Sequence, residues 1–348
     1  MFVLENRKTN PFIDSFLLKG QITDSTNKWA IDGTVLQHPS GDLYFIWSGW
    51  EGDINGMQIL YIARMSNPWT IGSKRVEIAR PVHSWETNHK PMVNEGPEVI
   101  IRNDTISLVY SASGSWTNDY CLGLITASTS SDPMNPDSWI KRAFPIFCSA
   151  NTLFAPGHCS FTKSFDDSED WIIYHTARYS GSGWIRQVRT QPFSWNSDST
   201  PNLGSPLDPN IPIPLPSGDQ LRDRYEATDA HLLNGPSLLP SRYTSSGYKI
   251  GHIDAPNSTV EFRVKCSKTG NYIVVVRNCN GSACQKKASH WFSVNDQNKQ
   301  QIFIVYSGWD HWGSTAVRVN LREGTNILRF QKGSNFAEID ELDICVDD

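Results

Sequence analysis

The chain has 348 residues, enough for two domains, because a single hydrophobic core rarely grows far beyond about 250 residues. Its formal net charge is -5 and it contains no run of Lys or Arg, which argues against a nucleic acid or an anionic membrane as the partner. No stretch approaches the roughly 18 apolar residues that a membrane span needs.

Three segments of the first two hundred residues resemble one another. Each begins with a short apolar strand that opens on a polar residue and continues into a second strand ending in an aromatic residue. The three polar residues are Asp32, Glu95 and His158, and both intervals between them are 63 residues long. Further strands are expected at Met1–Glu5, Phe16–Ile22, Ile59–Met65, Arg75–Ala79, Cys121–Ser128, Trp139–Ala143 and Gln187–Phe193.

Four strands per unit at a fixed period are typical of a β-propeller blade. The first strand of each blade lines the central channel, so the three polar residues are expected to converge at its mouth. Only three whole blades fit, fewer than the usual minimum of about four. The chain is therefore expected to start inside a blade, which would also explain why residues 1–12 lack the apolar region of a signal peptide.

Two of the converging residues suit the hydrolysis of a glycosidic bond. That reaction needs a protonated carboxylic acid at the leaving oxygen and a second carboxylate. Glu95 fits the first role, because burial and the charge of Asp32 would raise its pKa, while Asp32 is either a base or the neighbour that tunes Glu95. The alternatives are that both acids are turn residues beside glycine, and that His158 is a structural histidine rather than a ligand of a metal ion or water.

Several motifs in residues 1–198 closely resemble glycoside hydrolase family 43, and within it the exo-acting α-1,5-L-arabinanases and α-L-arabinofuranosidases. The stretches that carry this resemblance are WAIDGTV, WSGWEG, MSNPWTI, NEGPEV, YSASGSWT and PGHCSF, which begin at Trp29, Trp47, Met65, Asn94, Tyr110 and Pro156. The resemblance implies an all-β protein with a five-bladed propeller, here incomplete, and an inverting mechanism. It also implies a plant cell-wall polysaccharide as the substrate.

The same resemblance implies roles for individual residues. Glu95 would be the general acid and Asp32 the carboxylate that tunes its pKa, while His158 would hold a calcium ion or water at the propeller axis. Substrate-binding roles fall to Trp50 and Trp116, as walls of the sugar pocket, and to Arg186, in contact with the catalytic carboxylates. Each of the two tryptophans would serve equally well as blade core.

One feature of the family has no counterpart in the sequence. The family's general base is an Asp in an Ala-Asp-Pro-like motif on the first blade, a motif that this sequence does not contain. The repeat places its position before Met1. Because an inverting enzyme needs a base about 6.5–9.5 Å from the acid, the chain as written is expected to be inactive even if a longer parent is a competent enzyme.

A Pro-rich segment, residues 201–224, is expected to link the propeller in residues 1–200 to a second domain in residues 225–348. Short alternating strands with turns about every ten residues predict a jelly-roll-like β-sandwich there. The expected strands are Val260–Val264, Asn271–Arg277, Ile302–Val305, Ala316–Val319, Asn326–Phe330 and Ile339–Val346.

The second domain resembles carbohydrate-binding modules of families 6 and 35. The stretches that carry the resemblance are YEATDA, YKIGHID, GNY, GTNILRF and AEIDELD, which begin at Tyr225, Tyr248, Gly270, Gly324 and Ala337. It implies a structural calcium ion, with Glu226, Thr228 and Asp340 as candidate ligands, because hard cations prefer oxygen donors. It also implies sugar binding by Trp309 and Asn335. The alternative for the acidic residues is that they are solvated at strand ends.

Cysteine content and sequons favour secretion. Four cysteines, Cys266, Cys279, Cys284 and Cys345, lie in the last hundred residues and permit two disulfides in any of three pairings. The leading hypothesis is a secreted, monomeric arabinan-degrading hydrolase whose module tethers it to plant cell wall. Two alternatives remain open, a non-catalytic carbohydrate-binding protein and a β-xylosidase.

Overall fold

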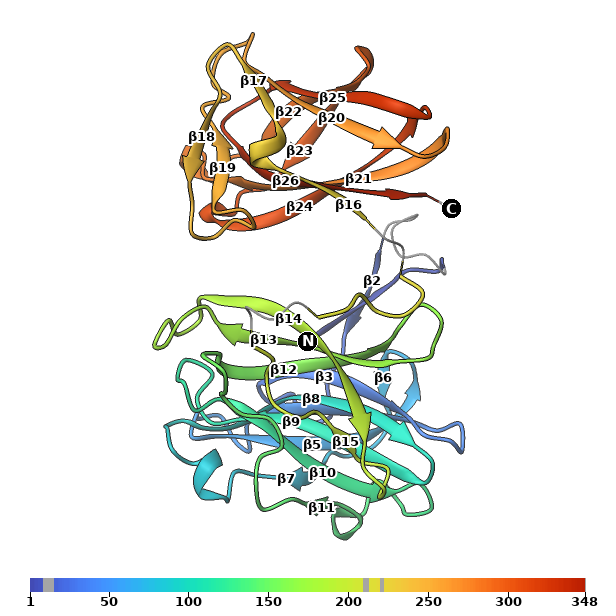
Figure 1. Cartoon of the computed structure of the whole chain (residues 1–348). Coiled ribbons are helices and arrows are strands. Elements are labelled where there is room, and N and C mark those ends of the chain that lie inside the picture. Colours follow the sequence, from blue (N-terminus) through green and yellow to red (C-terminus); the bar gives the residue numbers. More distant parts are fainter. Residues whose placement is uncertain (9–15, 209–212, 220–221, 348) are drawn as a thin grey trace. The chain divides into compact units, whose positions relative to one another are not determined.

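The computed structural model describes residues 1–8, 16–208, 213–219 and 222–347, and it divides into two compact units, Met1–Asp219 and Gln220–Asp348 (Figure 1). Both units are built from β-strands. The described residues add only four short 3₁₀ turns: η1 (Ser84–Glu86), η2 (Pro136–Ser138), η3 (Ala227–Asp229) and η4 (Ala283–Gln285). Within these ranges, no helix has the length and apolar character to cross a bilayer.

The first unit begins with a two-stranded ribbon, β1 (Phe2–Glu5) and β2 (Leu17–Gln21), and continues with three groups of sequentially paired antiparallel strands. The first group is β3 (Ala30–Gln37), β4 (Leu43–Gly49), β5 (Met57–Asn67) and β7 (Val76–Ala79), with β6 (Thr70–Ile71) also on β5. The second is β8 (Met92–Arg102), β9 (Thr105–Ala112), β10 (Cys121–Ser128) and β11 (Ile140–Lys141). The third is β12 (Phe154–Lys163), β13 (Asp170–Ala177), β14 (Arg186–Trp195) and β15 (Pro201–Asn202).

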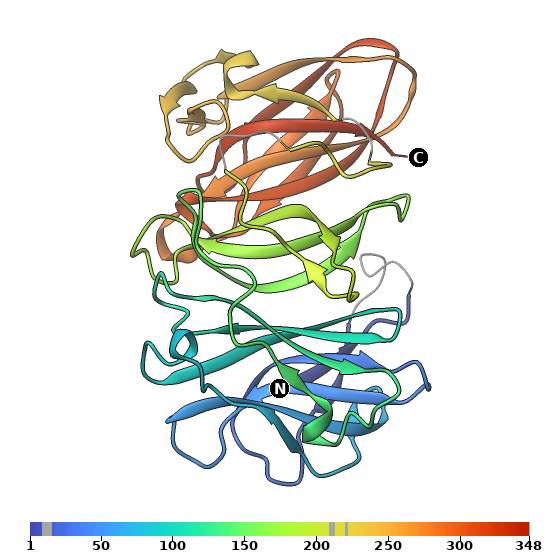
Figure 2. The ribbon, with the colours of Figure 1, turned by 60° about the horizontal axis from the view of Figure 1, so that its bottom comes forward.

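Each group has the up-and-down strand order of a propeller blade, and Figure 2 shows the three in succession from blue through teal to green. A short parallel contact between β5 and β8 joins the first group to the second. The all-β propeller-type fold and the strands expected in this unit are confirmed. The number of blades in a complete propeller stays a prediction.

Apolar packing between successive groups forms the core of the first unit. One cluster joins Ile46 and Leu60 of the first group to Leu108 and Ile125 of the second, and all four side chains are fully buried. A second cluster joins the second group to Ile172 and its neighbours in the third. The middle group is thus covered on both faces, which explains why nearly every residue of β9 and β10 is buried, including the serines of β9.

The second unit is a sandwich of two antiparallel sheets, as expected. One has the order β18 (Ser237–Pro240), β19 (Tyr248–Gly251), β26 (Glu338–Val346), β21 (Gly270–Asn280), β24 (Gly308–Leu321), with β16 (Asp223–Glu226) also paired to β26. The other has the order β17 (His231–Leu233), β20 (Thr259–Cys266), β25 (Gly324–Lys332), β22 (Ala288–Val294), β23 (Gln297–Ile304). The segment expected as a linker therefore contributes β15 to the first unit and the start of β16 to the second.

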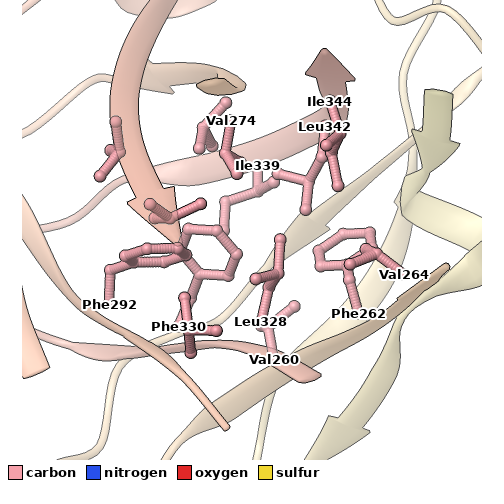
Figure 3. Packing of buried hydrophobic residues seen from close by; sticks show 14 of the residues in the cluster. Val260, Phe262, Val264, Val274, Phe292, Leu328, Phe330, Ile339, Leu342 and Ile344 are labelled. Atoms are coloured by element: carbon pink, nitrogen blue, oxygen red, sulfur yellow. The ribbon is translucent and has the colours of Figure 1, made fainter. Parts of the chain in front are cut away.

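Alternating apolar residues fill the space between the two sheets. Val260, Phe262 and Val264 point inward from β20 and meet Leu342 and Ile344 of β26 (Figure 3). Because successive side chains of a strand point to opposite faces, this two-residue spacing places one face of each strand in the core. Strand β22 was not expected, since serine and histidine interrupt its apolar pattern.

The two disulfides expected in the second unit are not found in the part of the chain that the structure describes. Strand register explains part of this difference. Cys279 lies opposite Glu338 at one end of the β21–β26 ladder, whereas Cys345 lies opposite Ile273 near the other end. At about 3.3 Å per residue these two cysteines are far beyond disulfide distance.

Candidate active site

Strands β3, β8 and β12 each carry a bulge at the corresponding position. In β3 the register shifts between Ile31 and Thr34, and equivalent shifts occur in β8 and β12. Residues with positive φ occupy these bulges: Asp32 at 57°, Gly96 at 52° and His158 at 48°. A bulge re-aims side chains out of the regular pleat. The repeat in the sequence therefore marks three local kinks, although in β8 the positive-φ residue is Gly96 rather than Glu95 itself.

The bulges bring the three predicted residues together. Asp32 Oδ2 accepts a hydrogen bond from the backbone N–H of Gly96, next to Glu95, at 3.1 Å. The same oxygen lies 3.9 Å from His158 Nδ1. A Cβ at position 96 would lie 3.1 Å from Cγ of His158, so this approach of the strands favours glycine. The expected convergence of Asp32, Glu95 and His158 is therefore observed, while their roles stay predictions.

The Glu95 carboxyl group has the raised pKa that is expected of a general acid. Burial raises its pKa above the usual range, and the charge of Asp32 raises it further. A hydrogen bond from the Tyr120 hydroxyl to Glu95 Oε1, 2.8 Å long, lowers it, as do the charges of His158 and Arg186. Burial is the largest of these effects, so the carboxyl group keeps its proton to higher pH than an exposed glutamate does.

A stack of side chains from β13, from β14 and from the residue before β10 supports Glu95. The rings of Tyr120 and His175 are parallel, with centroids 5.7 Å apart. Arg186 donates through Nη1 to Nε2 of His175 at 2.9 Å and through Nη2 to the carbonyl oxygen of Ser115 at 2.7 Å. Burial and the charge of Arg186 lower the pKa of His175 to about 3. His175 is therefore neutral at physiological pH, with its proton on Nδ1, because Nε2 accepts from an arginine that can only donate.

A fully buried carboxylate lies beneath the strand that carries Glu95. Glu86 Oε1 accepts from Asn94 Nδ2 at 2.7 Å and from the Tyr110 hydroxyl at 2.8 Å, and it lies 2.5 Å from Nζ of Lys141. Its other oxygen accepts two backbone N–H groups at 2.9 Å each. Because Asn94 directly precedes Glu95, this network fixes the backbone that presents the acid.

The two predicted pocket tryptophans lie in different surroundings. Trp50 stacks on Trp29, with ring centroids 4.8 Å apart and planes 20° apart. Trp116 meets the exposed Trp184 edge to face at 6.2 Å, and it directly follows Ser115, the residue whose carbonyl binds Arg186. Trp116 is therefore linked to the Glu95 cluster through Arg186, and Trp184 is a further exposed aromatic beside it.

In the second unit, the predicted sugar-binding residues lie around one corner of the sandwich. Trp309 is 41% exposed and packs flat over Gly281, where a Cβ would come within 2.3 Å of its ring. The neighbouring Ser282 both donates to the carbonyl and accepts from the N–H of Phe336, at 2.9 Å each. Asn335, next in the chain, uses its Nδ2 to bind the carbonyl oxygen of Lys287 at 2.7 Å.

Three carboxylates of the second unit form a cluster that suits a hard cation. Glu226, Asp340 and Glu341 each place an oxygen within 4.8 Å of the others. Glu341 Oε2 is buried and makes no hydrogen bond of good geometry, although Nη1 of Arg224 approaches it closely. Buried carboxylate oxygens of this kind are the ligands that calcium prefers. Arg277 pairs with Asp340, and Arg224 lies 3.1 Å from Glu341. The donor set therefore fits calcium, although two arginines share it.

Sequence reasoning named two of these three carboxylates and missed Glu341, which lies next to Asp340 in the same acidic stretch. It named Thr228, which lies in η3 with an exposed side chain. It also missed Tyr120 and His175. Their partners lie on other strands, and only the fold brings them together.

Comparison with known proteins places this arrangement in a family. The family model described as Glycosyl hydrolases family 43 matches residues 1–201. An extracellular exo-alpha-(1->5)-L-arabinofuranosidase of Streptomyces avermitilis is 38% identical over 234 residues, which cover 65% of this chain and 48% of that protein. Alpha-L-arabinofuranosidase 43 of Humicola insolens is 39% identical over 259 residues, covering 69% of this chain and 53% of that protein.

A solved structure agrees with these relatives. The alpha-L-arabinofuranosidase of Lactobacillus brevis has a TM-score of 0.56 and 36% identity, covering 61% of this chain and 67% of that one. The chain spans about half the length of the curated relatives it matches. The family match over more than half of the chain, together with the three-strand convergence around Glu95, shows that the chain belongs to glycosyl hydrolases family 43.

Proposed function

We propose that the protein hydrolyses terminal α-L-arabinofuranosyl residues of arabinan or of arabinose-decorated plant polysaccharide, with inversion at the anomeric carbon. The observation that carries this proposal is the raised pKa of the Glu95 carboxyl, in a cluster built from three neighbouring strands. The arabinofuranosidase names of the relatives support the sugar, and the word extracellular in one of them supports secretion.

Glu95 acts as the general acid in this proposal. A carboxyl group that holds its proton to higher pH than an exposed glutamate does donates it to the glycosidic oxygen as the bond to the sugar breaks. Asp32 keeps the pKa of Glu95 raised through its negative charge, and it fixes the strand through the N–H of Gly96. His158 lies near both Asp32 and His175, and in this proposal it would hold water or a cation at the propeller axis.

The base that activates water in an inverting reaction is a second carboxylate. The prediction that this stretch of chain lacks it stays a prediction, and so does the resulting inactivity. A small anion tests the point directly, because azide can attack the anomeric carbon without a base and yields the arabinosyl azide.

The second unit acts as the carbohydrate-binding part. Trp309 offers an exposed ring face for stacking on a sugar. A calcium ion held by Glu226, Asp340 and Glu341 would fix β16 to β26. Calorimetric titration with calcium should show one site that weakens at least tenfold in Glu226→Gln. Equal calcium affinity in the two proteins would show that these carboxylates do not bind the ion.

The proposed function is tested by measuring the product that the 348-residue chain releases from linear α-1,5-arabinan, which is arabinose in buffer and arabinosyl azide when azide is the nucleophile. Glu95→Gln is compared with Glu77→Gln, an equivalent change at an outer strand where the carboxylate pairs with Arg80. Release in buffer that is lost only in Glu95→Gln supports the proposal and places a base in the chain. Release only with azide supports the acid and the missing base. No release in either condition, with polysaccharide still bound, favours a non-catalytic binding protein.

A further inference from the structure

Cys121 and Cys148 lie opposite one another in a pair of antiparallel segments. Leu122 and Phe147 form an isolated bridge, with the N–H of Leu122 donating to the carbonyl of Phe147 at 2.9 Å. One residue outward, the bridge register sets Cys121 against Cys148. Residues directly opposite in an antiparallel pair have their Cβ atoms about 4.5–5.5 Å apart, close to the separation that a disulfide requires.

The side chains of this pair face each other. Residues directly opposite in an antiparallel pair project to the same face, and the interaction between the two thiols raises the pKa of Cys121 and lowers the pKa of Cys148. A second link holds the same segments together, because Ser149 Oγ donates to the carbonyl oxygen of Asn118 at 2.9 Å. The two sulfur atoms are therefore held together before any bond forms.

Exposure differs between the two cysteines in the way that thiol–disulfide exchange requires. Cys148 is exposed and Cys121 is buried. The thiolate is the attacking species, so the thiol with the lowered pKa and open access reacts first. Among the other five cysteines, only Cys284 is exposed, and it lies in the second unit.

We infer that Cys121 and Cys148 are a built disulfide site that closes in the presence of a small-molecule disulfide. The Cys148 thiolate attacks the small disulfide, RS–SR, and releases one RSH, leaving a mixed disulfide. Cys121 gives up its proton and attacks Sγ of Cys148, which releases the second RSH and forms the Cys121–Cys148 bond. The protein loses two hydrogen atoms and two electrons, and the small disulfide gains them.

The bond would brace the candidate active site. Cys121 directly follows Tyr120, whose hydroxyl holds Glu95. The bond closes a loop that contains the whole of β10 and β11. Constraining this loop in the unfolded chain should raise the melting temperature of the first unit by on the order of 5 °C.

The test uses the full chain carrying Cys284→Ser, so that Cys148 is the one fully exposed cysteine left. The protein is treated with oxidised glutathione, then denatured for thiol counting and intact-mass analysis. The expected result is a fall from six thiols to four without a glutathione adduct, reversed by dithiothreitol. A lasting adduct with one thiol lost, or six unchanged thiols, would overturn the inference.

Further variants identify which two cysteines form the disulfide. In the same background, Cys148→Ser should lose no thiols, whereas Cys159→Ser should still lose two. Cys121→Ala should keep a glutathione adduct on Cys148, and if this buried substitution prevents folding, the exposed Cys148→Ser change still decides the result. A loss of two thiols that disappears in Cys159→Ser would show that a different pair had formed. None of these readouts depends on glycosidase activity.

Discussion

Replacing Tyr120 with phenylalanine removes the hydroxyl group that donates a hydrogen bond to Glu95 and that also interacts with Ser111. The hydroxyl of this fully buried tyrosine donates to Glu95 Oε1 at 2.8 Å and lowers the pKa of the carboxyl. A hydrogen bond to a charged group is worth about 1.5–3 kcal/mol, and one pKa unit corresponds to about 1.4 kcal/mol. Tyr120→Phe should therefore raise the pKa of Glu95 by about 1 to 2 units.

The assay is a pH titration of side-chain carboxyl carbons by NMR in protein labelled at glutamate, with Glu95→Gln identifying the signal. Tyr174→Phe is the matched control, because this buried tyrosine donates to Gln191 in the same unit. A Glu95 pKa that is unchanged or lower in Tyr120→Phe would refute the account of how the acid is tuned.

The same change has a consequence for stability. Because the folded-state pKa of Glu95 lies above its unfolded value, its contribution to stability is fully present below the unfolded value and is lost as pH rises through the folded value. Tyr120→Phe moves that loss to higher pH and enlarges it. Urea unfolding at about pH 4 and about pH 7 should show the difference between the two free energies growing by roughly 1–3 kcal/mol.

Three further substitutions test other parts of the account. Gly157→Ala would place a Cβ 2.1 Å from the ring of Tyr120, so it should raise the Glu95 pKa and destabilise the first unit by about 1–3 kcal/mol; a neutral effect on both would contradict the described packing. Lys141→Met leaves the buried carboxylate below β8 without its cation and should cost about 3 kcal/mol in urea unfolding, and a loss below about 1 kcal/mol would contradict this. Trp309→Ala should abolish polysaccharide retention in affinity electrophoresis while Trp291→Ala, an equally exposed tryptophan, retains it; equal loss would assign binding elsewhere.

The sequence predicted the blade strands and the meeting of Asp32, Glu95 and His158, because a fixed repeat carries the same local structure into each sheet. The sequence did not predict Tyr120, which tunes the pKa of Glu95, or His175, which stacks on Tyr120. Tyr120 begins no repeated motif, and His175 looks like any polar residue of a half-buried strand; they meet only because neighbouring sheets pack face to face.

The repeat in the sequence also failed to predict local details of the backbone and of strand pairing. Counting from Asp32 aligns Glu95, yet the positive-φ bulge residue in β8 is Gly96, a shift that only backbone geometry reveals. The number of cysteines suggested disulfides in the second unit, but it does not reveal which cysteines the pairing of strands places opposite one another. It is register that separates Cys279 from Cys345 and sets Cys121 against Cys148.

The most direct test of Glu95 as the general acid is the loss of kcat/KM in Glu95→Gln on two substrates. Linear arabinan has a poor leaving group, and 2,4-dinitrophenyl α-L-arabinofuranoside has one that departs without a proton. With azide present if turnover requires it, the account predicts a loss of roughly a hundredfold or more on arabinan and less than about tenfold on the aryl substrate. Equal losses on both would contradict general-acid catalysis by Glu95.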